Sequence, residues 1–321
     1  MKKVAIFLMF IVFVLNIVVV FHKLNHKGPL PPAEAPQQSP VAPQSETPPP
    51  EVPPEPPAPK KAVPEFIEIA VFRTSEPNSV YGDVLSHSEE RPFGNSNGRA
   101  VNVHETSHGI HSYLRNKHGK NGFYCLEGRA VLVDGPRIKK STVNDFVPPN
   151  LRSYRYNLYL VGQREWEDTP LYIYDEWTAY ILGGKCCVDD VNRGVYVGSW
   201  TDGVSGCLEF SIYAIATAMA VKKYDPQYWE SNSQFRNYTI WALREANETY
   251  KTGHVMKQFK WKEQDELLSE FLTSSTAEGM RNFVNENLDG VWLDTQVTEM
   301  EYEFYQSRTL TEDDIKEDNR P

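Results

Sequence analysis

Two histidines stand four residues apart in the segment His104-Glu105-Thr106-Ser107-His108, and a glutamate directly follows the first. On an α-helix, residues i and i+4 lie one above the other on the same face, so both imidazoles can reach one metal ion. Glu105 lies about 100° further round the helix, where its carboxylate can take a proton from an activated water. The spacing predicts zinc-assisted hydrolysis, with His104 and His108 as zinc ligands and Glu105 as the general base.

The residues around this motif indicate a helix. Small and apolar side chains recur at positions 100, 103, 107, 110 and 114, which form one stripe of a helix surface. Residues 95–98 are typical of a helix start, and Lys117-His118-Gly119 is typical of a helix end. We therefore expect the motif to lie within a helix that has one face for the core and one for chemistry.

A catalytic zinc site needs a third protein ligand. His111 stands seven residues after His104, about 10 Å along a helix axis, so these two side chains cannot share an ion on a regular helix. Residues 168–184 also have helix punctuation, with Pro170 near the start and Gly183-Gly184 at the end. On this second helix Glu176 shares a face with tyrosines and an alanine, so we expect it to be half-buried and to be the third ligand. The alternative is a solvated helix residue.

The combination of His-Glu-x-x-His with a later Glu-x-x-Ala, at Glu176 to Ala179, resembles the gluzincin branch of zinc metallopeptidases. That branch includes thermolysin-like and anthrax-lethal-factor-like enzymes. The resemblance implies a zincin-like domain in which His104, His108 and Glu176 hold Zn²⁺ and Glu105 acts as the general base. Two features differ from the family: Glu176 stands sixty-eight positions after His108, further than in compact members, and position 180 is tyrosine rather than an acidic residue.

Because position 180 is not acidic, another carboxylate has to orient a zinc-ligating histidine. The candidates are Asp175, Asp189 and Asp190. A hydrogen-bond donor is also required beside the metal to stabilise an oxyanion. The candidates for this role are Tyr172, Tyr174, His111 and Tyr180, and we favour Tyr180 because it shares the face of Glu176. An extended peptide substrate could pair with an exposed strand edge at residues 129–133.

The chain divides into four regions. Residues 1–27 contain the apolar run Val4–Phe21 and predict an uncleaved signal-anchor, with a cleaved signal as the alternative. Residues 28–64 hold 15 of the 23 prolines and predict a disordered polyproline II spacer. Residues 65–310 are the expected zincin-like domain, and residues 311–321 are an acidic tail.

Within the folded region the sequence predicts an α+β fold with a small mixed sheet and a mainly helical C-terminal part. Strands are expected at residues 66–72, 123–125 and 129–133, whereas residues 154–161 fit either a strand or a helix. Further helices are expected at residues 208–224, 229–250, 263–272 and 277–288.

The net charge and the cysteines limit which partners and which cellular compartment are expected. Beyond residue 64 the chain carries 27 Lys and Arg against 39 Asp and Glu, a net charge of −12, which argues against nucleic acid as a partner. Cys186 and Cys187 are adjacent, so each would need Cys125 or Cys207 as a disulfide partner. Two disulfides would fit an extracytoplasmic location.

We therefore expect a single-pass, membrane-anchored zinc metallopeptidase whose catalytic domain lies outside the cytoplasm and acts on a peptide or protein. Two alternatives stay open. One is a zincin-like domain that has lost catalysis and serves as a tethered binding module, and the other is a structural envelope protein.

Overall fold

Helix α3 (Arg99–His118) carries the His-Glu-x-x-His segment in the computed structural model, which describes residues 63–89, 98–198 and 202–293. The expected stripe is buried at Ala100, Val103, Ile110 and Leu114, and the helix ends before Gly119, so the prediction of this helix is confirmed. The predicted signal-anchor 1–27, residues 28–62 of the linker, the helix-capping residues 95–97 and the tail 311–321 lie outside the described residues.

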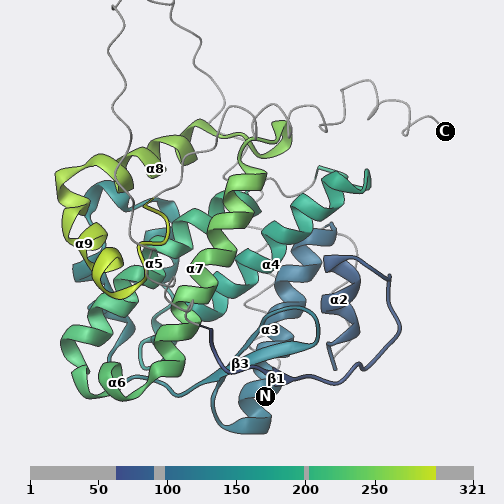
Figure 1. The fold of residues 1–321 in the computed structure, drawn as a ribbon, viewed down its shortest axis with the longest axis horizontal. Helices are drawn as coiled ribbons and strands as arrows, with labels where there is room; N and C mark the ends of the chain where they lie inside the picture. Colours follow the sequence, from purple (N-terminus) through teal and green to yellow (C-terminus); the bar gives the residue numbers. More distant parts are fainter. Residues whose placement is uncertain (1–62, 90–97, 199–201, 294–321) are drawn as a thin grey trace, which may run out of the picture. The chain divides into compact units, whose positions relative to one another are not determined.

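Helix α4 (Tyr172–Asn192) lies between α3 and α5 (Gly203–Tyr224), as Figure 1 shows. The predicted second helix is confirmed, but its predicted end at Gly183-Gly184 is wrong, because α4 continues to Asn192. A Cβ at Gly184 would lie 2.9 Å from the Cys207 sulfur and 3.1 Å from the Gly203 carbonyl oxygen, both on α5. The glycine therefore allows two helices to approach closely, which a sequence cannot distinguish from a helix stop.

The sheet has three strands in the order β1 (Ile67–Glu68), β3 (Arg129–Val133), β2 (Asn121–Tyr124). Both pairs are antiparallel, with Ile67 opposite Ala130 and Phe123 opposite Val131. The α+β class is confirmed for the described residues, whereas the prediction of a mixed sheet is wrong. The predicted exposed edge at residues 129–133 is also wrong, because β3 is the central strand.

The chain around β1 departs from the predicted strand at residues 66–72. The strand has only two residues, and beyond it the Phe72 amide donates to the carbonyl of Ser86, the last residue of α2 (Val80–Ser86), at 2.8 Å. Helix α2 was not predicted. Its start has a recognisable signal, since the Ser79 hydroxyl accepts a hydrogen bond from the Gly82 amide at 2.9 Å.

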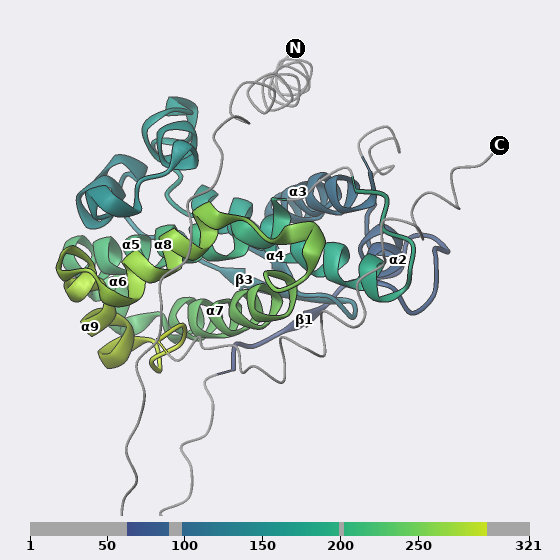
Figure 2. The ribbon, with the colours of Figure 1, turned by 90° about the horizontal axis from the view of Figure 1, so that it is seen from above.

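Short helical turns connect β3 to α4, and Figure 2 shows them in blue-green beside α5. The 3₁₀ turns are η2 (Lys140–Phe146), η3 (Pro149–Leu151) and η5 (Arg164–Trp166), and η4 (Tyr156–Val161) is a π-helix. The segment that fitted either a strand or a helix is therefore helical.

The C-terminal part is helical, as predicted. It contains α6 (Pro226–Ser231), α7 (Ser233–Gly253), η6 (Lys257–Phe259), α8 (Lys262–Thr273), η7 (Ser275–Ala277) and α9 (Glu278–Asn287). The helix predicted at residues 229–250 is divided at Asn232, whose side chain caps α7 by accepting from the Phe235 amide at 2.9 Å. Among the described helices α5 alone is long and apolar enough to cross a bilayer, but 94% of its apolar window is buried, as expected for a core helix.

Candidate metal centre

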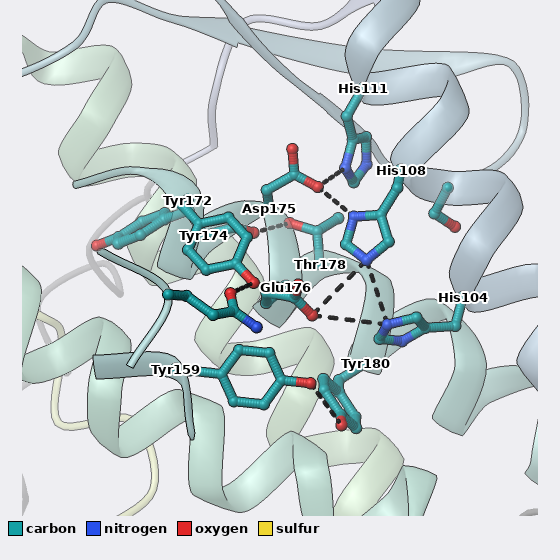
Figure 3. A network of polar contacts seen from close by, with 12 residues as sticks. His104, His108, His111, Tyr159, Tyr172, Tyr174, Asp175, Glu176, Thr178 and Tyr180 are labelled. Atoms are coloured by element: carbon teal, nitrogen blue, oxygen red, sulfur yellow. Dashed lines mark hydrogen bonds and ion pairs between the residues drawn. The ribbon is translucent and has the colours of Figure 1, made fainter. Parts of the chain in front are cut away.

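The side chains of His104 and His108 from α3 and Glu176 from α4 point their possible metal-ligand atoms at one another. The Nε2 atoms of His104 and His108 are 3.2 Å apart, and the Glu176 Oε2 atom lies 3.6 Å from each of them (Figure 3). A tetrahedral ion with bonds of ~2.1 Å separates its ligand atoms by about 3.4 Å. The three spacings therefore match one face of a tetrahedral zinc site.

One oxygen of the Glu176 carboxylate accepts a hydrogen bond from the same helix, and the other faces the two histidines. Its Oε1 accepts a hydrogen bond from the Tyr172 hydroxyl at 2.7 Å, one helical turn earlier on α4. Its Oε2 is buried and has no hydrogen-bond partner in the described part of the chain. Burial raises the pKa of Glu176, but the neighbouring imidazoles of His108 and His104 outweigh it and lower the pKa to about 2. A buried carboxylate oxygen without a donor is the arrangement that a cation would stabilise.

Asp175 holds the other side of the His108 ring. Its Oδ1 atom accepts from the Nδ1 atoms of His108 at 2.5 Å and His111 at 2.9 Å, and its Oδ2 accepts from Arg115 at 2.5 Å. Because an ionised carboxylate only accepts, a proton of His108 lies on Nδ1, and Nε2, which faces His104 and Glu176, is the ring nitrogen that a metal ion would bind. Burial lowers the pKa of His108, but the carboxylates of Glu176 and Asp175 outweigh it and raise the pKa well above its usual value.

A second group with ligand-type atoms consists of His108, His111 and Asp175. It is a poor cation site, because both Nδ1 atoms point their protons at the shared Asp175 oxygen and Arg115 brings a positive charge to the other oxygen. His111 therefore contacts Asp175 rather than the three converging ligand atoms, in agreement with the helix geometry that separated it from His104.

Glu105 is 8% exposed, and its Oε2 atom is buried without a hydrogen-bond partner within the described residues. Asp175 and Glu176, the two neighbouring carboxylates on α4, lie beside His108, and Arg115 contacts Asp175.

Tyr180 lies against the site through its ring. The ring centroids of Tyr180 and His104 are 4.7 Å apart, and the Tyr180 hydroxyl lies 3.4 Å from both the Tyr159 hydroxyl and the Arg155 Nε atom. In Figure 3 the two phenols lie on the side of the histidine pair opposite Asp175. Burial raises the pKa of both phenols, so each keeps its proton at neutral pH and can donate a hydrogen bond.

Of the three carboxylates expected to orient a histidine, the structure places only Asp175 at His108. The Asp189 side chain accepts from the Val80 amide at 3.1 Å, and Asp190 accepts from Arg99 at 2.9 Å. Of the other oxyanion candidates, the Tyr172 hydroxyl contacts Glu176, whereas the Tyr174 hydroxyl points away to Thr239 at 3.0 Å.

Several residues at the site were not predicted. Tyr159, Arg155 and Gln163 come from the turns before α4, and no spacing rule connects them to the motif. Arg115 had a usable signal, because it lies seven residues after His108 on the same helix stripe.

The predicted disulfides are absent: none of Cys125, Cys186, Cys187 and Cys207, all within the described ranges, forms one. All four are buried. The Cys186 thiol faces Asp190 at 3.7 Å, and the Cys207 thiol faces the Tyr180 carbonyl at 3.6 Å.

Comparisons with known proteins identify no relative. No family model matches this chain, and neither the curated proteins nor the solved structures contain a significant match.

Proposed function

We propose that this protein is a zinc-dependent peptidase of the zincin type, tethered to a membrane by its N-terminal segment. One observation carries the proposal: the Nε2 atoms of His104 and His108 and the Oε2 atom of Glu176 are spaced as tetrahedral ligands, with Oε2 buried and without a donor. The order of these residues in the sequence and the glutamate beside His104 also support it.

The residues present fit a hydrolytic mechanism. A zinc ion held by the three ligands supplies a Lewis acid that polarises a carbonyl and acidifies water. Glu105, next to His104 on α3, would accept the proton of the attacking water and return it to the leaving amine. Asp175 keeps the His108 ring in one tautomer, and the protonated phenol of Tyr180 is the proposed donor toward the oxyanion.

The membrane tether is a further part of the proposal. It is supported by the sequence alone, through the eighteen-residue run Val4–Phe21 and the proline-rich stretch that follows. The proposed topology places the catalytic domain outside the cytoplasm. Protease protection of intact cells against permeabilised cells tests it, because an extracytoplasmic domain is degraded without permeabilisation.

The first experiment is zinc content by mass spectrometry on the full chain in detergent. We expect about one zinc per chain in the wild type and in Glu105→Gln, and a loss of zinc in His108→Ala and Glu176→Ala, because each removes one of three ligands. A matched control is His254→Ala, which removes a half-buried histidine whose Nδ1 contacts the Tyr250 carbonyl, outside the site. This variant should retain zinc.

Hydrolysis of a peptide library then separates catalysis from binding. The wild type should cleave and lose activity with a chelator, and Glu105→Gln should keep its zinc and lose at least 100-fold in rate, within the usual contribution of a general base. A chain without zinc, or a Glu176→Ala variant that keeps its zinc in full, would refute the metal centre. Zinc without cleavage of any substrate would favour the tethered binding module instead.

A further inference from the structure

The Tyr172 hydroxyl joins Glu176 to a residue outside α4. It lies 2.7 Å from Glu176 Oε1, and it also forms a short hydrogen bond with the Gln163 side chain, whose Oε1 atom faces it. A phenol has one proton, and a carboxylate can only accept, so the proton goes to Glu176. Two acceptors cannot share that proton, so the Gln163 amide is assigned the orientation turned by a half-turn, which exchanges its oxygen and nitrogen and lets its NH₂ group donate to the phenol oxygen. The three side chains thus form one directed chain that ends on Glu176.

The backbone at Gln163 is held in a costly conformation. Gln163 has φ +48° in the left-handed region, which is uncommon for a residue other than glycine and costs ~1 kcal/mol or more. It follows Gly162, where a Cβ would lie 2.6 Å from the Leu158 carbonyl oxygen. This pair of residues comes directly after the π-helix η4, a form that is rare and is frequent at functional sites.

A buried lysine stabilises this backbone. Lys140 is 1% exposed, and its ammonium donates to the carbonyls of Tyr159 at 2.6 Å, Leu160 at 3.1 Å and Gly162 at 2.7 Å. All three ammonium protons are used to satisfy carbonyls at the end of η4, and one of those carbonyls belongs to the residue directly before Gln163. On the other side of the chain, Trp166 stacks on the Tyr172 ring with centroids 4.8 Å apart.

We propose that Gln163, fixed by Lys140, is a positioning residue that acts through Tyr172 to aim the Glu176 carboxylate at the metal. This inference rests on the proposed function. The chain of contacts anchors Oε1 and so leaves Oε2 as the atom directed at His104 and His108. Gln163 contacts Tyr172, and Lys140 contacts the carbonyl directly before Gln163, so each residue acts through a neighbour.

The test measures Zn²⁺ affinity by competition with a chromophoric chelator, on the full chain in detergent. Gln163→Met keeps the side-chain length and removes the amide, and Tyr172→Phe removes the hydroxyl. Each should weaken Zn²⁺ binding about 10-fold, the lower end of the range for residues that orient a ligand. The double variant should bind no more weakly than Tyr172→Phe, because without the hydroxyl the amide has nothing to act on.

A spectroscopic readout separates positioning from general destabilisation. With Co²⁺ in place of Zn²⁺, the visible absorption of the metal reports its coordination geometry. Gln163→Met and Lys140→Met should shift this spectrum, whereas the control Tyr174→Phe should not, because the Tyr174 hydroxyl contacts Thr239 and not the site.

The outcomes distinguish this inference from the proposed function. Wild-type protein that binds neither Zn²⁺ nor Co²⁺ overturns both. Wild-type protein that binds Zn²⁺ while Gln163→Met binds it equally well, or a double variant with additive losses, overturns the positioning role alone. If Lys140→Met does not fold, the decision rests on Gln163→Met, whose side chain is half-exposed.

Discussion

At the residue scale, two consecutive acidic residues serve opposite sides of one imidazole. Asp175 contacts the Nδ1 atom of His108 at 2.5 Å, and Glu176 lies 3.6 Å from its Nε2 atom. Successive side chains of a helix point about 100° apart, so two consecutive residues of α4 can contact the His108 ring from two sides. Asp175 is thus the residue that holds the His108 ring on the side opposite Glu176.

This arrangement predicts that Asp175→Asn weakens Zn²⁺ binding by about 10- to 100-fold, because the neutral amide no longer fixes the His108 tautomer. It should also lower the free energy of unfolding of the metal-free protein by about 1–3 kcal/mol, since Arg115 loses a buried partner. Zinc competition and urea unfolding measure the two effects. Asp134→Asn is the control, because the Asp134–Lys120 pair is exposed and should change neither quantity. Unchanged zinc affinity in Asp175→Asn would contradict the orienting role.

At the element scale, the position of α4 depends on its close packing against α5. Gly184 is the residue where the two helices approach, with a Cβ there 2.9 Å from Cys207 Sγ and 3.1 Å from the Gly203 carbonyl oxygen. Gly109, in the middle of α3, is different, because a Cβ at this position would have open space for 4 Å around it. The same substitution should therefore have opposite effects at the two glycines.

We expect Gly109→Ala to raise the free energy of unfolding by about 0.5–1 kcal/mol, the ordinary gain in helix propensity. Gly184→Ala should instead lower it by about 1–2 kcal/mol, because overpacking exceeds that gain. Urea unfolding of both variants measures the difference. An equal gain at both positions would mean that the α4–α5 contact is looser than the structure indicates.

At the scale of the whole molecule, a charged network joins segments that lie far apart in the sequence. Arg99, at the start of α3, donates to Glu76 at 2.8 Å and to Asp190 of α4 at 2.9 Å, and Arg193 also pairs with Glu76. The Arg99 hydrogen bond is the largest influence on Glu76, and despite the opposing effect of burial the pKa of Glu76 is lowered to about 2.

Because the pKa of Glu76 is lower in the folded protein than its unfolded value of 4.5, the ionised carboxylate stabilises the fold at pH values above 4.5. This stabilisation is lost as the pH falls from 4.5 toward 2. Glu76→Gln should therefore lower the free energy of unfolding at pH 7 by about 1–2 kcal/mol, a figure reduced for the partial exposure of the side chain. The difference from the wild type should shrink between pH 4.5 and pH 2 in urea unfolding. Glu127→Gln is the control, since Glu127 is 77% exposed in its pair with Arg129. A difference that stays constant with pH would contradict this account.

The sequence by itself determined the features that depend on local periodicity. The helix around His104 and His108, the helix that carries Glu176 and the two strands of the hairpin follow from spacing and side-chain type, because neighbours along the chain decide them. Helix geometry also separates His111 from the histidine pair on spacing alone.

The tertiary structure alone decided what depends on contacts between distant segments. It made Gly184 a packing position instead of a helix stop and β3 a central strand instead of an edge. Of the three carboxylates that could orient a histidine, only Asp175 contacts His108, and Gln163, directly after a π-helical turn, contacts Tyr172. The physical reason is that these outcomes depend on which surfaces face each other. The hydrophobic effect that packs the helices together is non-directional, so the local sequence does not specify which faces meet.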